Sequence, residues 1–313
     1  MSEIRVQCDG MRLDAFLASE TPESSRSQIK RAIESGEVAV NGSPCTKAGR
    51  KLNPGDTVQW NAPQMPETGA PRPETGIAYR VVYEDPHILV IDKPSGLVVH
   101  PGAGNLSGTL INGLLAAYPE LASVGEPDRP GIVHRIDSAT SGLLVVARSQ
   151  TAYETLVRMF AAHDVHRQYW AICYGPKLPD SGRFDTPYGR HPTQRVKYSS
   201  KFDAPKRAIT NYRVSTRTPS GFILVTCLLE TGRTHQVRVH LSDHNAPILG
   251  DPLYAPPKIA HHKAIERLAL HAQRLAFAHP VTHEPCAFES PFPQDFLAAM
   301  HTLGLAFSHD DHR

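Results

Sequence analysis

One aspartate of this sequence lies where a carboxylate could do chemistry. Asp137 follows Arg135 by two positions, inside the polar segment Gly-Ile-Val-His-Arg-Ile-Asp-Ser-Ala-Thr-Ser-Gly at residues 131–142. Apolar runs on both sides are typical of strand edges, and Gly142 lets the chain enter the second strand without a side-chain clash. An acid held in this way can be a catalyst, but a lone Asp in a Ser/Thr/Gly turn is more often a cap or a solvated turn-former.

Composition limits what the protein can be. With 313 residues the chain is long enough for two domains, and 33 Lys and Arg against 31 Asp and Glu give a net charge of only +2. A nucleic-acid partner would therefore need a local basic surface. The N-terminus lacks the apolar run of a signal peptide, and no run of about 18 apolar residues could span a bilayer. These features predict a cytoplasmic protein with no membrane partner.

The spacing of cysteines and histidines does not suggest a metal site. The 5 cysteines are far apart without a Cys-x-x-Cys pair, and none of the 17 histidines belongs to a His-Glu-x-x-His motif. We therefore expect buried thiols in a reducing compartment, ordinary core and surface histidines, and no metal.

A proline-rich stretch divides the chain. Residues 63–76 hold prolines at four positions and no apolar periodicity, which is the composition of a semi-rigid linker. The stretch separates a small unit at 1–62 from a larger one at 77–305. The His- and Asp-rich residues 306–313 are expected to be a frayed tail.

The N-terminal unit carries a local excess of basic side chains. Apolar spacing predicts a helix around Leu13, a second helix from Ser25 to Gly36, and a hairpin turn at Asn41-Gly42. A basic helix face is usually just a solvated surface, but a phosphate backbone could also lie on it. The basic residues are Arg26, Lys30, Arg31, Lys47, Arg50 and Lys51.

Four short motifs follow one another over residues 10–60. They are Met-Arg-Leu-Asp-Ala-Phe-Leu, Ser-Arg-Ser-Gln-Ile-Lys-Arg-Ala-Ile, Gly-Glu-Val-Ala-Val-Asn-Gly and Pro-Gly-Asp-Thr-Val. In this order they resemble an S4 RNA-binding domain, a small α/β domain that grips structured RNA. The resemblance implies RNA contacts from Arg26, Lys30, Arg31 and Asn41.

The larger unit shows short strands interleaved with a few helices. Strands are expected at 88–92, 142–148, 167–174 and 222–230. A helix is expected at 149–162, with one apolar face formed by Tyr153, Leu156, Val157, Phe160 and Ala161. Strand and helix do not alternate strictly, so the pattern predicts an α+β domain with a mixed, largely antiparallel sheet.

Four segments of this unit carry a second resemblance. They are Lys-Pro-Ser-Gly-Leu-Val-Val-His-Pro-Gly-Ala-Gly-Asn from 93, the Asp137 turn, Arg-Gln-Tyr-Trp-Ala from 167, and the stretch 229–254 with Thr-Gly-Arg-Thr-His-Gln-Val-Arg and Gly-Asp-Pro-Leu-Tyr. Together they resemble the RluA/RluD family of pseudouridine synthases over residues 77–300. The first segment is most similar to the ribosomal large-subunit branch. Ile136 replaces the Leu of the family's His-Arg-Leu-Asp signature.

The resemblance implies an isomerase that breaks a uridine's N-glycosidic bond, turns the base and rejoins it through carbon, without a metal or redox cofactor. It makes Asp137 the essential carboxylate, either as the nucleophile at C1′ or as the base that removes the 2′ proton. Both roles need an ionised carboxylate shielded from water. The resemblance implies Arg238 as its counter-ion, which a planar guanidinium can be. Outside the motif, Arg238 would be taken for an exposed strand arginine.

An enzyme that acts on this bond must draw the nucleotide out of the RNA stack. By resemblance Tyr169 stacks on the extruded uracil, and its hydroxyl could also handle the C5 proton, while Arg135 fills the vacated space. Without the resemblance Tyr169 would be a core tyrosine, and Leu228 or Leu229 could line the pocket or belong to the core. A further basic run is expected to line the RNA path or to form a mobile loop. It contains Arg183, Arg190, Arg195, Lys197, Lys201, Lys206 and Arg207.

The sequence therefore predicts a monomeric pseudouridine synthase with an S4 domain, acting on large-subunit ribosomal RNA. One alternative is a tRNA or mRNA pseudouridine synthase of the same family. Another is an inactive RNA-binding assembly factor, against which the set Asp137, Tyr169 and Arg238 argues.

Overall fold

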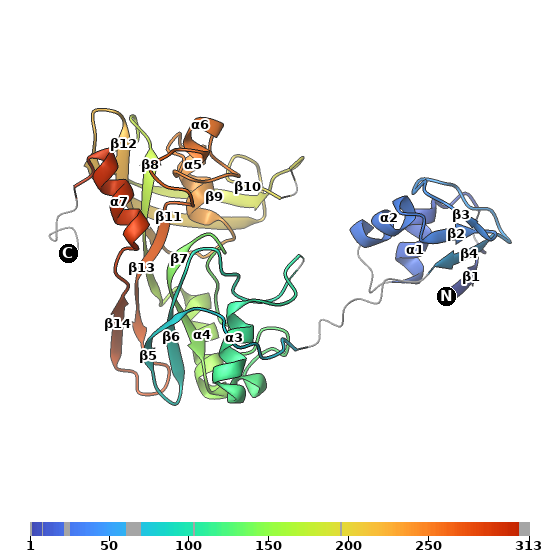
Figure 1. Cartoon of the computed structure of the whole chain (residues 1–313), viewed down its shortest axis with the longest axis horizontal. Helices are drawn as coiled ribbons and strands as arrows, with labels where there is room; N and C mark the ends of the chain where they lie inside the picture. The colour runs from blue at the N-terminus through green and yellow to red at the C-terminus, as the bar shows by residue number, and fades with distance from the viewer. Residues whose placement is uncertain are drawn as a thin grey trace. The chain divides into compact units, whose positions relative to one another are not determined.

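The computed structural model describes residues 2–7, 9–21, 26–60, 70–102, 104–194 and 196–306, with only the backbone given at residues 2, 26–28 and 31. The chain divides into two compact units, residues 1–69 and 70–313, and the division falls within the predicted linker (Figure 1). Each unit has its own hydrophobic core.

The N-terminal unit combines two helices with a four-stranded antiparallel sheet. The helices are α1 (Leu13–Glu20) and α2 (Arg26–Glu34). The strands, in sheet order, are β1 (Ser2–Arg5), β4 (Thr57–Trp60), β2 (Val38–Val40) and β3 (Ser43–Pro44). Helical and alternating apolar positions fill the core, among them Leu13, Phe16, Leu17, Ile29, Ile33, Val38, Val40, Val58 and Trp60. The hairpin predicted at Asn41-Gly42 is confirmed, since both residues have the positive φ that such a tight turn needs.

The larger unit is built on a ten-stranded sheet, which confirms the predicted α+β class. In sheet order its strands are β10 (Tyr198–Ser199), β9 (Ser181–Arg190), β11 (Lys206–Arg217), β12 (Phe222–Leu229), β8 (His166–Tyr174), β13 (Leu270–Ala278), β7 (Ser141–Ala147), β6 (Ile88–Lys93) and β5 (Arg80–Glu84), and β14 (Pro285–Glu289) also pairs with β13. The helices are α3 (Leu110–Ala117), α4 (Gln150–Ala162), α5 (Gln236–Asp243), α6 (Pro257–Ala260) and α7 (Gln294–Leu303), with a 3-10 turn at Pro119–Ser123. Among these described strands, β7 and β13 pair in parallel and the other pairs are antiparallel.

Both faces of the β6–β7 part of the sheet are buried. Successive side chains of a strand point to opposite faces. Leu143 of β7 packs in a cluster with Leu156 of α4, whereas its neighbour Leu144 packs in another cluster with Leu114 of α3. This two-sided burial explains why residues 143–146 are apolar without alternation.

The predicted apolar face of α4 is partly wrong. Leu156 is buried, but Val157 is 41 % exposed and Ala161 is also exposed. Ala152 is buried in their place. The face that meets the sheet therefore begins earlier in the helix than the sequence pattern predicts.

Strand β13 joins the two halves of the sheet. It comes late in the chain, yet it lies between β8 and β7 in space, with Leu270 beside Ala171 and His271 beside Ser141. Figure 1 shows it running from the half that holds β8, β11 and β12 to the half that holds β6 and β7. The turn that carries Asp137 is thereby brought close to β8.

Gly142 is required where β7 meets β13. Its φ is 111°, in the region that favours glycine, and a Cβ atom there would collide with the backbone of Ala272. The expectation that this glycine avoids a side-chain clash is therefore confirmed.

We expect Gly142→Ala to lower the free energy of unfolding by about 2–6 kcal/mol, because backbone strain and overpacking each cost about 1–3 kcal/mol. Urea denaturation measures the loss. Gly96→Ala is the matched control, since Gly96 has a φ of 93° but a Cβ atom added to it would meet nothing within 4 Å. Equal losses in the two variants would show that the contact with β13 contributes nothing.

Candidate active site

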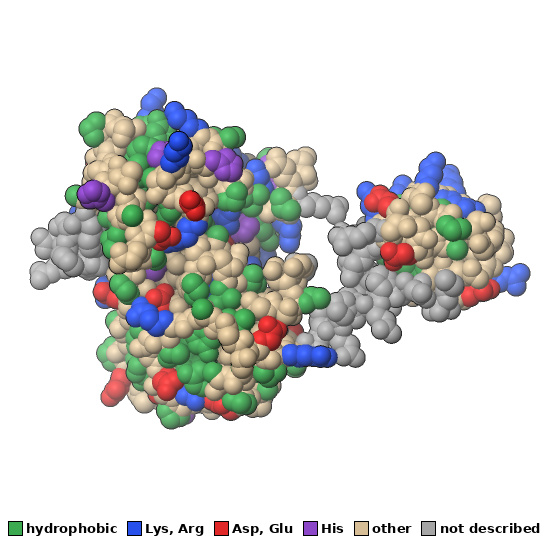
Figure 2. Space-filling model, viewed as in Figure 1, with side chains coloured by type: hydrophobic (Ala, Val, Ile, Leu, Met, Phe, Trp, Pro, Cys, Tyr) green, Lys and Arg blue, Asp and Glu red, His purple; other side chains and the backbone are tan. Residues whose placement is uncertain are grey.

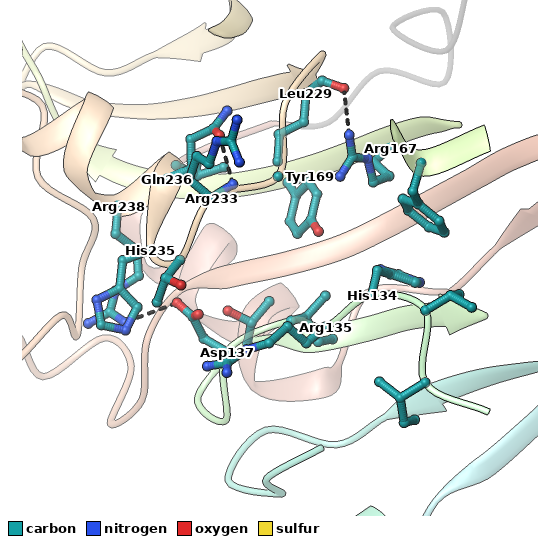
Figure 3. Close-up of a pocket in the computed structure, with 18 of the residues that line it drawn as sticks. His134, Arg135, Asp137, Arg167, Tyr169, Leu229, Arg233, His235, Gln236 and Arg238 are labelled. Atoms are coloured by element: carbon teal, nitrogen blue, oxygen red, sulfur yellow. Dashed lines mark hydrogen bonds and ion pairs between the residues drawn. The ribbon is translucent and has the colours of Figure 1, made fainter. Parts of the chain in front are cut away.

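A cavity of about 450 Å³ opens beside the turn that carries Asp137 (Figure 3). Its wall is formed by the loop before β7, the start of β8, the end of α4, and the chain from the end of β12 into α5. A volume of this size suits a small ligand or a single nucleotide base. Five residues that the sequence analysis considers for the site line it, namely Arg135, Asp137, Tyr169, Leu229 and Arg238.

Arg238 links two carboxylates. Its Nη1 donates to Asp137 Oδ2 at 3.0 Å, while its Nε and Nη2 donate to Asp251 Oδ2 and Oδ1, both at 2.8 Å. The side chains of Arg238 and Asp251 are only 7 % and 1 % exposed. The two-pronged contact with Asp251 fixes the guanidinium plane, so the remaining N–H group is aimed at Asp137. The predicted contact between Arg238 and Asp137 is therefore present.

The charges of Arg238, Asp137 and Asp251 do not cancel, and the excess negative charge faces the cavity. Burial opposes the charge of Arg238, but its hydrogen bond and ion pair with Asp251 outweigh burial and raise its pKa. The ring of Tyr254 also lies 5.1 Å from the guanidinium carbon. Two ionised carboxylates on one arginine leave one net negative charge. Asp137, the more exposed of the two acids, presents that charge to the cavity.

The turn behind Asp137 is tied to the end of β6. Lys93 is buried, and its Nζ donates to Ser138 O at 2.9 Å and to two other backbone carbonyl oxygens. Burial lowers the pKa of Lys93 to about 7. Ser95 Oγ donates to Ala139 O at 2.7 Å. The segment that begins at Lys93 therefore holds the Asp137 turn in place.

Tyr169 also lines the cavity, from strand β8. Its side chain is almost fully buried, and burial raises its pKa to about 12, so the phenol is neutral at pH 7. Figure 3 shows its ring and hydroxyl pointing into the cavity that Asp137 also lines. The cavity thus presents an aromatic ring and a carboxylate to the same bound group.

The wall of the cavity is strongly basic. Among the described residues that line it, Asp137 supplies the carboxylate, and arginines and histidines supply most of the other ionisable groups. Such a wall attracts a polyanion. The arginines are Arg129, Arg135, Arg167, Arg233 and Arg238, and the histidines are His100, His134, His163 and His235, of which His134 is neutral because burial lowers its pKa to about 3.

Arg135 is exposed and lies between two cavities. It lines the one described above and a neighbouring cavity of about 280 Å³, which is also lined by His100 and Asn105. A flexible, exposed cation at this position can move without disturbing the core.

None of the other predicted RNA contacts that the structure describes is among the residues that line the cavity. Lys197 is half-buried and does not line it, and Lys30 is exposed with its Nζ 3.6 Å from Glu34 Oε1. Asn41 Nδ2 donates to Asp56 Oδ1 at 2.8 Å, so this amide closes a turn of the N-terminal unit. The side chains of Arg26 and Arg31, and all of Arg195, lie outside the described residues. Figure 2 shows basic side chains along the upper edge of the N-terminal unit and at its right-hand end.

The second basic run is not simply a mobile loop. Arg183 and Arg207 lie on the paired strands β9 and β11, and both form ion pairs with Asp185. Lys201 Nζ lies 3.5 Å from Asp243 Oδ1. Internal acids therefore offset part of the positive charge predicted for this region.

Several polar residues of the site have no role in the sequence analysis, and Asp251 and His134 are two of them. Asp251 follows Arg238 by 13 positions in the Gly-Asp-Pro-Leu-Tyr motif, which entered only as part of the resemblance. His134 Nε2 accepts a hydrogen bond from Val145 N at 3.0 Å, and burial lowers its pKa to about 3. The sequence offered two signals for these residues, namely that Asp251 belongs to a family motif and that His134 directly precedes Arg135. Apolar periodicity could not reveal either contact.

Comparison with known proteins shows which family has this arrangement. The model of the RNA pseudouridylate synthase family matches residues 87–243, a range that includes Asp137, Tyr169 and Arg238. The chain belongs to the RNA pseudouridylate synthase family. Members of this family are isomerases that convert uridine in RNA to pseudouridine. A second model, that of the S4 domain, matches residues 11–58, so the N-terminal unit is an S4 domain.

Relatives resemble the chain over most of its length. A ribosomal large subunit pseudouridine synthase D of Xanthomonas campestris is 44% identical over 304 residues, which cover 94% of this chain and 89% of the relative. An uncharacterized RNA pseudouridine synthase of Bacillus subtilis is 42% identical, with 93% and 94% covered. The structure of human RNA pseudouridylate synthase domain containing 1 matches 71% of this chain and 86% of its own, at 25% identity and a TM-score of 0.58.

Two features are absent from the described part of the chain. Within it, no helix has the length and apolar character that crossing a membrane requires. The same residues contain no group of three or more His, Cys, Asp or Glu that could hold a metal ion.

Proposed function

We propose that this chain converts specific uridines of large-subunit ribosomal RNA to pseudouridine. The main observation in support of this reaction is that Asp137 and Arg238 line a basic cavity together with Tyr169, and that Asp251 holds Arg238 from behind the cavity wall. The relative named as a ribosomal large subunit enzyme and the S4 domain support the substrate. We further propose a monomer that works in the cytoplasm on structured RNA.

Asp137 is proposed to act on the ribose. Its carboxylate either attacks C1′ or removes the proton at C2′, and Arg238 holds it charged and aimed in both cases. Asp251 is a positioning residue, because it fixes the guanidinium and lies too deep to reach a substrate. The reaction is an isomerisation, so it consumes no co-reactant.

Tyr169 and Arg135 are proposed to handle the extruded nucleotide. Drawing a uridine out of its stack costs a few kcal/mol, and stacking on an aromatic ring returns roughly 1–3 kcal/mol. Tyr169 presents its ring inside the cavity, while the exposed Arg135 lies at its edge. Arg135 can therefore enter the gap left in the RNA without unfolding the site.

Mapping of pseudouridine in total RNA tests this proposal. Cells with and without the protein are compared, and each missing site is restored with the purified chain in vitro. We expect the missing sites to lie in large-subunit ribosomal RNA. Sites confined to tRNA or mRNA would contradict the substrate, and an unchanged map together with an inactive purified chain would indicate an assembly factor.

Removal of residues 1–69 is expected to weaken RNA binding and to flatten its salt dependence. Exposed basic side chains of the S4 domain, such as Lys30, Lys47 and Lys51, displace counterions from phosphates, and each lost contact reduces the slope by about 0.7–0.9. Filter binding at several salt concentrations measures both effects. Because the larger unit has its own core, the rate at saturating RNA should stay within about threefold of the full chain. An unchanged salt slope would contradict the docking role.

A further inference from the structure

Arg167 is a buried cation in the cavity wall. Its exposed fraction is 7 %, it lines the cavity, and its Nε has no hydrogen-bond partner among the described residues. Its Nη2 donates to Glu230 O at 3.2 Å and to Leu229 O at 3.5 Å, and both acceptors are neutral backbone carbonyls. No carboxylate in the described part of the chain forms an ion pair with it.

The surroundings of Arg167 hold it in place without neutralising it. Its guanidinium carbon lies 5.5 Å from the ring centroid of Phe160. The ring of His134 stacks on the same Phe160, and burial keeps His134 neutral by lowering its pKa to about 3. A Cβ atom at Gly232 would collide with Arg167 Nη1, so this glycine leaves room for the guanidinium. The site is therefore shaped around a cation.

A buried charge without a counter-ion is costly, and burial lowers the pKa of Arg167 accordingly. Arg238, which is also buried in the cavity wall, contacts two carboxylates, whereas no carboxylate of the described residues contacts Arg167. A bound ligand is therefore the available source of a negative charge to pair with Arg167. Because side chains two positions apart on a strand share a face, Arg167 lies beside Tyr169 on β8.

Both proposed roles of Asp137 make the base negative. When the carboxylate attacks C1′, or removes the 2′ proton so that C1′ and C2′ become doubly bonded, the N1–C1′ bond breaks and both electrons go to N1. The detached uracil shares this charge between N1 and its two carbonyl oxygens until C5 bonds to C1′. C5 then loses a proton and N1 gains one. Asp137 is restored, either by expulsion from C1′ or by return of its proton to C2′.

We propose that Arg167 is a further catalytic residue, whose fixed positive charge stabilises the uracil anion held against Tyr169. This inference rests on the proposed isomerase function. Preorganised charge of this kind acts where charge develops in the transition state and is absent from the bound uridine, so it raises the rate more than the affinity. The alternative partner of Arg167 is an RNA phosphate, which Arg167 would contact equally in the bound substrate and in the transition state.

The test compares Arg167→Met with the wild-type full chain in single-turnover assays. The substrate is a transcript that contains a uridine identified by the map, made either with uridine or with 5-fluorouridine. Fluorine withdraws electrons and stabilises the detached 5-fluorouracil anion, so its departure depends less on the positive charge of Arg167. Nuclease digestion and mass spectrometry follow the loss of the original nucleoside.

We expect Arg167→Met to slow base detachment about 100-fold with uridine, as loss of one preorganised donor does, and no more than about 10-fold with 5-fluorouridine. The dissociation constant should change less than about twofold. Arg167→Lys, which keeps the charge, should restore part of the rate. Equal losses on both transcripts would overturn the proposal. Weaker binding with a salt slope reduced by about one would assign Arg167 to a phosphate instead.

A measurement of thermal stability distinguishes a catalytic role of Arg167 from a purely structural one. Removing an unpaired buried charge should leave the melting temperature of Arg167→Met equal to or above that of the wild type, although the rate falls. Gly232→Ala supplies a second variant, since its Cβ displaces the guanidinium while keeping the arginine. Like Arg167→Met, Gly232→Ala should slow base detachment less with 5-fluorouridine than with uridine. A wild-type chain that is inactive on both transcripts would refute the proposed function itself, whatever the variants do.

Discussion

Asp137→Asn is expected to lower the rate of pseudouridine formation by about four orders of magnitude or more. The amide is close in shape to the carboxylate and can still accept the hydrogen bond from Arg238, but it is neither a nucleophile nor a base. RNA affinity should stay near that of the wild type. A single-turnover assay on the mapped substrate measures the rate, and filter binding measures the affinity.

Asp128→Asn is the matched control for this change. Asp128 is exposed in a turn outside the cavity, so the variant has the same change of charge and should keep the wild-type rate. If Asp137→Asn retained more than about a tenth of the activity, the assignment of the reaction centre to Asp137 would be wrong.

Arg238→Met is expected to remove activity and to lower the free energy of unfolding by about 3–5 kcal/mol. The variant leaves the Asp251 carboxylate, which is 1 % exposed, buried without its counter-ion. Its remaining bonds come from the backbone N–H groups of Leu253 and Tyr254. Urea denaturation and the single-turnover rate measure the two losses.

A double variant separates stability from catalysis at this position. Arg238→Met combined with Asp251→Leu replaces the buried pair by apolar side chains, so most of the lost stability should return. Activity should not return, because nothing then aims Asp137. If activity recovered together with stability, Arg238 would only stabilise the fold and would have no part in catalysis.

The elements around the site could be predicted where local pattern decides the structure. The expected strands at 88–92, 142–148, 167–174 and 222–230 correspond to β6, β7, β8 and β12, because apolar runs bounded by turn residues fit buried strands. The contact of Asp137 with Arg238 joins residues 101 positions apart, and only the family resemblance could suggest it.

The rest depends on tertiary contacts that no local pattern shows. Asp251 gains its role from α5, which places Arg238 beside it. Arg167 has no role in the sequence analysis, because only the structure shows that no carboxylate of the described residues pairs with it. Asn41 was expected to contact RNA, yet its amide bonds with Asp56 and Thr57 follow from the fold of the turn. The RNA-binding role of Asn41 stays a prediction.

The position of β13 has a consequence for how the enzyme is made. Asp137 precedes β7 and Tyr169 lies on β8, and these two strands are held together by a strand formed from residues 270–278. A nascent polypeptide still attached to the ribosome therefore cannot assemble the reaction centre until this late strand has emerged and inserted. A chain that lacks residues 270–278 would therefore lack the strand that joins β7 to β8, and it could not hold Asp137 and Tyr169 together.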